Sequence, residues 1–185
     1  ILHIRRVRIV DQNKSNKTII VALIILIISM TFIFIMDKTK QTDTSEETNA
    51  DKLYAHKSEY IGDSSNISGL LNLLPYSEYK TSIELSTSDK PYGLKAIYNI
   101  GDSAVNISDL KNQFYNNALI VFSLIENVDY IDFELIDEDS AEPEVHHYDR
   151  KEIQDSHIDN LYGYSADLQT FENFLMEKVY MPGGS

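Results

Sequence analysis

The stretch Ala118–Ile136, ALIVFSLIENVDYIDFELI, decides the fold of this chain. Its first part, residues 118–125, is apolar on nearly every side, which is typical of a helix that is buried on more than one side. Its second part, residues 128–136, alternates apolar residues with Asp132 and Glu134, as expected for a strand with one solvent-exposed face. A buried helix that leads into a half-exposed strand indicates an α+β domain.

The residues upstream continue the alternation of helix and strand. Residues 62–65, GDSS, supply a turn and an N-cap, and apolar residues at helical spacing follow until Pro75. Residues 79–87 and 94–100 alternate between apolar and polar, and the turn residues between them predict a hairpin. Ser108 then begins the long buried helix as its predicted cap.

Two segments resemble each other, because IGDS followed by NIS and a leucine occurs at residues 61–70 and again at 100–110. They are either a duplicated unit or two independent helix starts, since such turns select Gly, Asp and Ser in any case. With Tyr60-Ile61 as a first short strand, both interpretations give the order βαββαβ, that of a ferredoxin-like antiparallel sheet. We expect a C-terminal helical extension in which Ser165 caps a last helix that packs on the sheet.

A transmembrane helix is predicted ahead of this domain. Residues 19–36, IIVALIILIISMTFIFIM, contain no charged side chain. As a helix they would rise ~27 Å at ~1.5 Å per residue, close to the ~30 Å hydrocarbon core of a bilayer. Small residues of the kind that mark a signal-peptide cleavage site do not follow, so we expect an uncleaved anchor in the lipid bilayer.

Charge predicts the orientation of this anchor. Residues 1–36 contain five basic residues and one acidic residue, whereas residues 37–185 contain 11 basic and 28 acidic residues, a net charge of −17. The positive-inside rule therefore places the N-terminus in the cytoplasm and the C-terminal domain outside the cell membrane. The acidic balance argues against a nucleic-acid partner, and the absence of Cys excludes disulfide scaffolds and thiol catalysis.

The sequence thus divides into four parts. Residues 1–18 are predicted to be a cytoplasmic basic arm and residues 19–36 the transmembrane helix. Residues 37–57 are rich in Thr, Asp, Glu and Lys, so we expect a disordered stalk there. Residues 58–180 are predicted to be the extracytoplasmic α+β domain.

Candidate metal ligands surround the pair His146-His147. They include carboxylates and a third histidine, namely Glu142, Glu144, Asp149 and His157. Adjacent histidines in a strand point to opposite faces, and no HExxH spacing occurs, so we expect a half-exposed loop in which Arg150 and Lys151 offset nearby carboxylates. A zinc site remains the alternative.

The acidic run Asp137-Glu138-Asp139, with Glu142 and Glu144, offers oxygen ligands for calcium. It lacks the spacing of an EF-hand loop, and a solvated loop is the simpler interpretation. No G-x-S-x-G nucleophile motif and no phosphate-binding glycine-rich loop occur. We therefore assign no catalytic, cofactor-binding or metal-binding residue, expect no cofactor, and lean towards a protein that is not an enzyme.

Several pieces of the outer region resemble an uncharacterised family, a domain of unknown function from low-GC Gram-positive bacteria. The most distinctive pieces are Pro91-Tyr92-Gly93-Leu94 and the run from Ala118-Leu119 through Leu124-Ile125 to Asn127-Val128-Asp129. Further matches are Tyr60-Ile61-Gly62-Asp63, Leu70-Leu71, Leu74-Pro75, Ile83-Glu84-Leu85, Tyr148, Arg150, Phe171 and Phe174-Leu175. The resemblance implies a place on single-pass membrane proteins or on membrane metallopeptidases of the beta-lactam-sensor type.

These observations predict a single-pass membrane protein whose outer domain binds a ligand or another envelope protein. The resemblance adds a sensory or regulatory role, in envelope stress or in the response to antibiotics. Two alternatives stay open: an envelope hydrolase that uses His146, His147 and nearby carboxylates, or a structural accessory subunit of a membrane complex.

Overall fold

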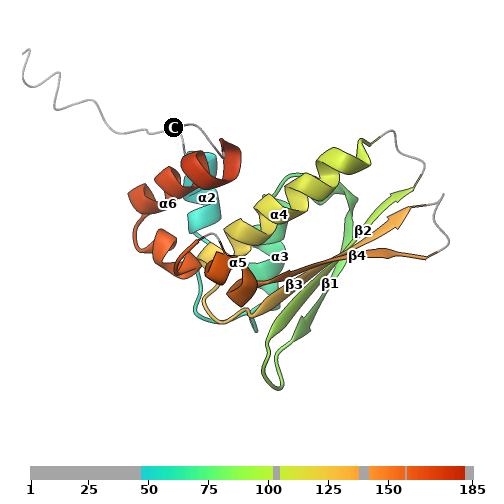
Figure 1. The fold of residues 1–185 in the computed structure, drawn as a ribbon, viewed down its shortest axis with the longest axis horizontal. Coiled ribbons are helices and arrows are strands. Elements are labelled where there is room, and N and C mark those ends of the chain that lie inside the picture. The colour runs from blue at the N-terminus through green and yellow to red at the C-terminus, as the bar shows by residue number, and fades with distance from the viewer. Residues whose placement is uncertain (1–46, 102–104, 138–141, 157, 182–185) are drawn as a thin grey trace, which may run out of the picture. The chain divides into compact units, whose positions relative to one another are not determined.

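The computed structural model describes residues 47–101, 105–137, 142–156 and 158–181 (Figure 1). They belong to one compact unit that begins at Glu47. The predicted basic arm and the predicted membrane span at 19–36 lie outside the described residues. Among the residues that are described, no helix is both long enough and apolar enough to cross a membrane.

The domain combines five helices with four strands in the described part of the chain. The helices are α2 (Asn49–Tyr54), α3 (Ser64–Asn72), α4 (Ile107–Leu124), α5 (Arg150–Ser156) and α6 (Leu168–Phe174). The strands are β1 (Lys80–Ser86), β2 (Gly93–Gly101), β3 (Tyr130–Asp137) and β4 (Glu144–Asp149). Two short 3-10 segments, η1 (Ser77–Tyr79) and η2 (Leu161–Ser165), and a π-helical continuation of α6, η3 (Leu175–Tyr180), complete the elements.

The four strands lie in the order β1-β2-β3-β4. The two outer pairs are antiparallel, and the central pair, β2 with β3, is parallel, with Ala96 opposite Phe133. The α+β class is confirmed, but the ferredoxin-like antiparallel order is wrong. Helix α4 connects two strands that are neighbours in the sheet, and a crossover of this length makes them parallel.

The predicted first strand at Tyr60-Ile61 does not form. The Tyr60 side chain is 67% exposed, while Ile61 is buried in the core. The amide of Ile61 donates to Oδ1 of Asn127 at 2.7 Å, and an isolated bridge pairs Ser58 with Ile125 nearby. The fourth place in the sheet is taken instead by residues 144–149, which we had expected to be a loop.

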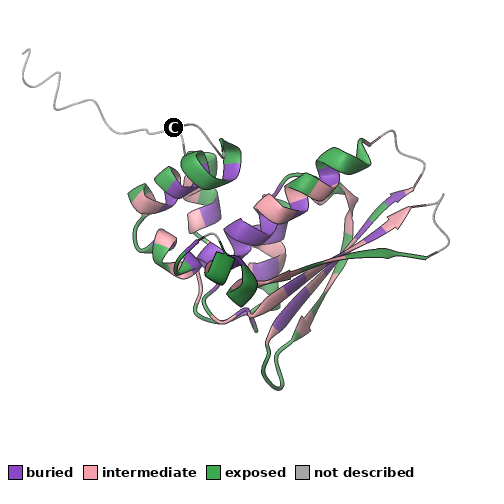
Figure 2. Ribbon diagram, viewed as in Figure 1, coloured by how far each residue is buried: buried purple, intermediate pink, exposed green. Residues whose placement is uncertain are grey.

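The core lies between α4 and one face of the sheet. All residues of the apolar run 118–125 are buried, as predicted (Figure 2). From the sheet, alternate residues of β2 and β3 point to the same side and meet Phe114 of α4, whose ring stacks on Phe133 at 4.7 Å and lies 4.9 Å from Tyr98. No described helix covers the opposite face of the sheet (Figure 1).

Three helices begin with a side chain that accepts hydrogen bonds from backbone amides of the first turn. Asp63 caps α3 by accepting a hydrogen bond from the amide of Asn66, in the turn predicted for it. Helix α4 is capped by Asn106, whose Oδ1 accepts from the amides of Ser108 and Asp109 at 3.0 and 3.4 Å, so the predicted cap Ser108 is wrong. Helix α6 is capped by Asp167, two residues after the predicted Ser165.

Both ends of the described region pack together. Residues 49–54, within the segment expected to be a disordered stalk, form α2, whose Leu53 is buried. The ring of Tyr54 lies 5.8 Å from that of Phe171 in α6. Helix α6 therefore packs on α2, and η3 on α4, rather than on the sheet as predicted, because α4 already covers the inner sheet face.

Candidate functional site

The histidine pair occupies strand β4, and its two rings lie on opposite faces of the sheet. His146 is opposite Phe133 and faces the core, with its ring 5.6 Å from that of Phe114. His147 is opposite Asp132 on the uncovered face, where its Nδ1 lies 2.6 Å from Oδ1 of that carboxylate. The two rings therefore point to opposite faces, as predicted. They do so from strand β4 and not from the loop that was expected at these residues.

Charged side chains next to His146 belong to β4 and α4. Nε2 of His146 lies 3.3 Å from a Glu144 oxygen, and the same carboxylate binds Nζ of Lys111 at 2.8 Å. The hydrogen bond from Lys111 lowers the pKa of Glu144. Burial lowers the pKa of His146, which favours the uncharged imidazole.

The other proposed ligands do not join this pair. Within the described residues, no group of three or more His, Asp or Glu side chains is arranged to hold a metal ion. His157, Glu138 and Asp139 lie outside the described residues, and Glu142 is exposed. The zinc and calcium alternatives thus gain no support from the described geometry.

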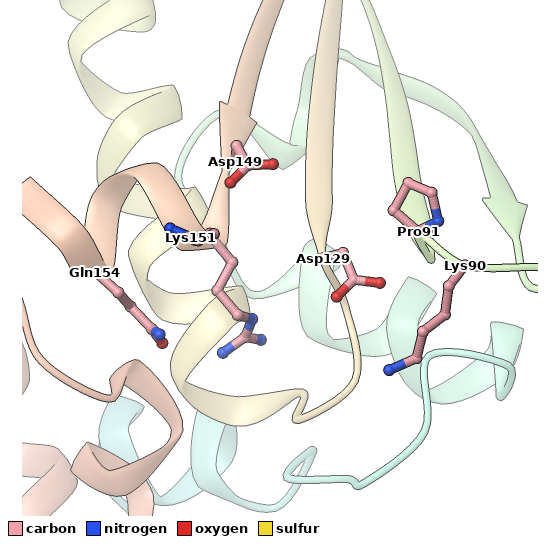
Figure 3. A pocket seen from close by; sticks show the side chains of 7 residues that line it. Lys90, Pro91, Asp129, Asp149, Lys151 and Gln154 are labelled. Carbon is pink, nitrogen blue, oxygen red and sulfur yellow. The ribbon is translucent and has the colours of Figure 1, made fainter.

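A different set of charged side chains surrounds a pocket at one end of the sheet. Because β2 and β3 are parallel and β4 is antiparallel to β3, the starts of β2 and β3 and the end of β4 meet there. The pocket has a volume of about 470 Å³, within the range of small-molecule sites. Its lining is Lys90, Pro91, Asp129, Asp149, Arg150, Lys151 and Gln154 (Figure 3).

Arg150 is the most tightly held of these residues. Its Nε donates to the carbonyl of Val128 at 2.6 Å and its Nη2 to the carbonyl of Ile125 at 2.5 Å. The guanidinium carbon lies 4.9 Å from the centre of the Phe122 ring, so the cation also contacts an aromatic face. Burial lowers the pKa of Arg150 to about 10, which leaves the side chain positively charged at neutral pH.

Asp129 connects the three chain segments that form the pocket. Its Oδ2 accepts a hydrogen bond from the amide of Tyr92 at 2.6 Å, and its own amide donates to the Tyr92 carbonyl at 2.8 Å. Its backbone carbonyl accepts from the amide of Arg150 at 2.9 Å. This one residue therefore fixes the turn before β2 and the first residue of α5 relative to β3.

Two further side chains are held by backbone amides. Oδ1 of Asp149 accepts from the amide of Glu152 at 3.0 Å, and Oε1 of Gln154 accepts from the amide of Leu161 at 3.1 Å. Lys151 pairs with Asp155 on the exposed side of α5. The pocket is therefore a strongly charged concavity in which several of the lining side chains are held by hydrogen bonds to the backbone.

Sequence reasoning identified only part of this pocket. The sequence places Arg150, Lys151 and Asp149 beside the histidine pair, but it does not single out Lys90, Asp129 or Gln154 as site residues. The family resemblance does point to two of these regions, because Pro91-Tyr92-Gly93-Leu94 and the run ending at Asp129 are its most distinctive pieces. The pairing of the Asp129 carboxylate with Tyr92 explains why these two pieces meet in space.

A second groove lies between α2 and the α6–η3 segment. Its volume is about 520 Å³, and its walls combine amide and hydroxyl groups with Leu175, Met176 and Tyr180. Its charged side chain is Glu172. This groove is more apolar than the pocket at the sheet end and adjoins Thr48, close to where the described chain begins.

Comparison with known proteins gives one match. No curated protein and no solved structure matches the chain. A family model, described as a domain of unknown function (DUF4825), matches residues 53–149, which is more than half of the chain. The match runs from α2 to the last residue of β4, so it contains the sheet and ends immediately before Arg150. The chain therefore belongs to the DUF4825 family of domains of unknown function.

Proposed function

We propose that this protein is a single-pass membrane protein whose outer domain binds a ligand or an envelope protein through the charged pocket at the sheet end. The observation that carries the proposal is the pocket itself, in which Arg150 is fixed by two backbone carbonyls and Asp129 by a backbone amide. Side chains fixed in this way cost little entropy when they bind a partner. Such preorganisation is typical of binding sites.

The membrane anchor rests on the apolar stretch at residues 19–36 and on the charge difference between the two sides of it. Ten residues, 37–46, separate this stretch from the first described residue. A chain of that length reaches at most ~35 Å when fully extended.

A sensory or regulatory role, in envelope stress or antibiotic response, is supported by the family resemblance alone. In this proposal, a signal from the domain reaches the cytoplasm through one helix or through a partner protein. The hydrolase alternative draws no support from the described geometry, because His146 and His147 face opposite sides of β4. A sensor would bind a small ligand or a protein in the pocket, whereas a structural accessory subunit would bind only a protein there.

The topology can be tested with single cysteines, because the native chain has none. We expect a Ser88→Cys variant, in the exposed turn before β2, to react with a membrane-impermeant maleimide in intact cells. A Ser15→Cys variant in the basic arm should react only after the cells are permeabilised. The opposite pattern, or labelling of both cysteines in intact cells, would contradict the proposed orientation.

Binding through the pocket can be tested by photo-crosslinking in cells. We expect benzoylphenylalanine at position 154, on the pocket wall, to capture a specific protein if the partner is a protein. The same amino acid at position 112, on the exposed side of α4, serves as the matched control. A product at both positions would indicate unspecific contact. If neither a protein at position 154 nor any small ligand is found, the binding proposal is wrong.

A further inference from the structure

We propose that the pocket at the sheet end binds a small zwitterion, a molecule that carries both a carboxylate and an ammonium group, such as an amino acid or the end of a short peptide. This inference rests on the proposed binding function and names its ligand class. The argument comes from which polar atoms of the pocket are already used within the domain and which are left for a ligand.

The cationic groups left for a ligand are on Lys90 and Arg150. Two nitrogens of Arg150 are used by the carbonyls of Ile125 and Val128, and Nη1 has no hydrogen bond to any described residue. Lys90 is exposed, lies above the Tyr92 ring at 5.7 Å, and forms no ion pair within the described part of the chain. These two groups suit a ligand carboxylate, which accepts from a planar guanidinium with good geometry.

The anionic groups left for a ligand are on Asp129 and Asp149. Each carboxylate uses one oxygen for a backbone amide, Oδ2 of Asp129 for Tyr92 and Oδ1 of Asp149 for Glu152. The second oxygen of each makes no hydrogen bond to a side chain or amide among the described residues. Two such oxygens at one concavity suit an ammonium group, which has three donors and no acceptor.

The charges on the pocket wall balance. Lys151 is paired with Asp155 on α5, so the other charged side chains of the lining are Lys90, Arg150, Asp129 and Asp149, of which Asp129 also interacts electrostatically with Arg150. A simple anion would be attracted by the two cations but repelled by the two carboxylates. A simple cation would be attracted by the carboxylates but repelled by the cations. A zwitterion, whose net charge is zero, satisfies both pairs at once.

The arrangement in space agrees with this division. Figure 3 shows Lys90 and Asp129 on one side of the pocket and Lys151, Asp149 and Gln154 on the other. Lysine and aspartate side chains therefore lie on both sides, where the carboxylate and ammonium groups of an amino acid would each meet an opposite charge. The volume of about 470 Å³ leaves room for a side chain or a second residue.

The test uses glycylglycine as the probe and isothermal titration calorimetry on the full chain in detergent micelles. Two derivatives are titrated in parallel: N-acetylglycylglycine, which lacks the ammonium group, and glycylglycinamide, which lacks the carboxylate. We expect glycylglycine to bind and each derivative to bind at least about 10-fold more weakly, a loss of about 1.4 kcal/mol. If either derivative binds as tightly as glycylglycine, the zwitterion inference is wrong.

Variants locate the binding. Lys90→Met changes an exposed side chain, so the fold should be retained, and we expect it to weaken glycylglycine binding at least about 5-fold, equivalent to roughly 1 kcal/mol. Lys178→Met, on the exposed side of η3 and away from the pocket, is the control and should bind as the parent does. Equal binding by the parent and Lys90→Met would overturn the assignment of Lys90.

The experiments distinguish a failure of the zwitterion inference from a failure of the proposed binding function. If none of the three peptides binds but position 154 captures a specific protein, the zwitterion inference is wrong and the binding function stands. If glycylglycine binds and the derivatives do not, both stand.

Discussion

At the scale of single residues, Arg150 is the side chain on which the pocket most depends. It holds the carbonyls of Ile125 and Val128, which link the end of α4 to the start of β3. Arg150→Met would leave both carbonyls without these donors, and each lost hydrogen bond to a charged group costs roughly 1.5–3 kcal/mol. We expect the free energy of unfolding to fall by about 3–6 kcal/mol in urea denaturation.

The neighbouring residue provides a matched control. Lys151 pairs with Asp155 on the surface of α5, with 82% and 63% of the two side chains exposed. Lys151→Met should therefore change the unfolding midpoint very little. Equal destabilisation by the two variants would show that Arg150 acts through its charge alone and not through the two carbonyls.

His146 should make the stability of the domain depend on pH. Burial lowers its pKa in the folded state, while Glu144 opposes and Lys111 adds to this effect. As the pH falls below about 6.5, the unfolded chain therefore takes up a proton that the folded chain binds less readily, so the free energy of unfolding decreases. Stability should be highest above that pH and decline towards pH 5.

The measurement is urea denaturation at several pH values between 7 and 5. His146→Gln, which removes the titrating ring, should make the decline shallower. Ile83→Val, a non-titrating change at a half-buried position of β1, should lower stability equally at every pH. A decline that is as steep in His146→Gln as in the parent would assign the pH dependence to other groups.

At the scale of elements, the C-terminal helix α6 belongs to the core although it follows the family match. Phe171 is fully buried between Tyr54 of α2 and Phe174. We expect Phe171→Ala to lower the free energy of unfolding by about 3–5 kcal/mol, the usual cost of this truncation in a core.

Asn173→Ala, at an exposed position of the same helix, is the control for this prediction. It should change the unfolding midpoint by a small amount in the same urea titration. If Phe171→Ala were also nearly neutral, α6 would not be part of the cooperative unit that contains the sheet.

At the scale of the whole molecule, local patterns predicted α3, α4, β1, β2 and β3 but missed β4, α2 and the arrangement of the strands. The apolar run at 118–125 and the alternation in 94–100 identify a helix and a strand, because burial imposes those periods. The parallel pairing of β2 with β3 depends on contacts between residues about 37 positions apart, such as Ala96 with Phe133, which no local period encodes. Strand β4 was missed because the polar residues Glu144, His146 and His147 obscure its alternation.

The pocket was harder to predict than the fold. Its residues come from the turn before β2, the turn before β3 and the start of α5, and each is an ordinary turn or cap residue when read alone. Lys90 and Gln154 line the same pocket only because β2, β3 and β4 share one sheet end. Charge on its own indicates a solvated surface, which holds for Lys151 but not for the partly buried Arg150.

The family match ends at the boundary between β4 and α5, and this boundary divides the pocket. The sheet, α4 and four of the seven pocket residues lie within residues 53–149, whereas Arg150, Lys151 and Gln154 lie just beyond them. A segment cut at the family boundary would keep Asp129 and lose the guanidinium that binds the same turn. In this chain, the proposed binding pocket therefore extends beyond the segment that identifies the family, and any test of the pocket needs residues on both sides of that boundary.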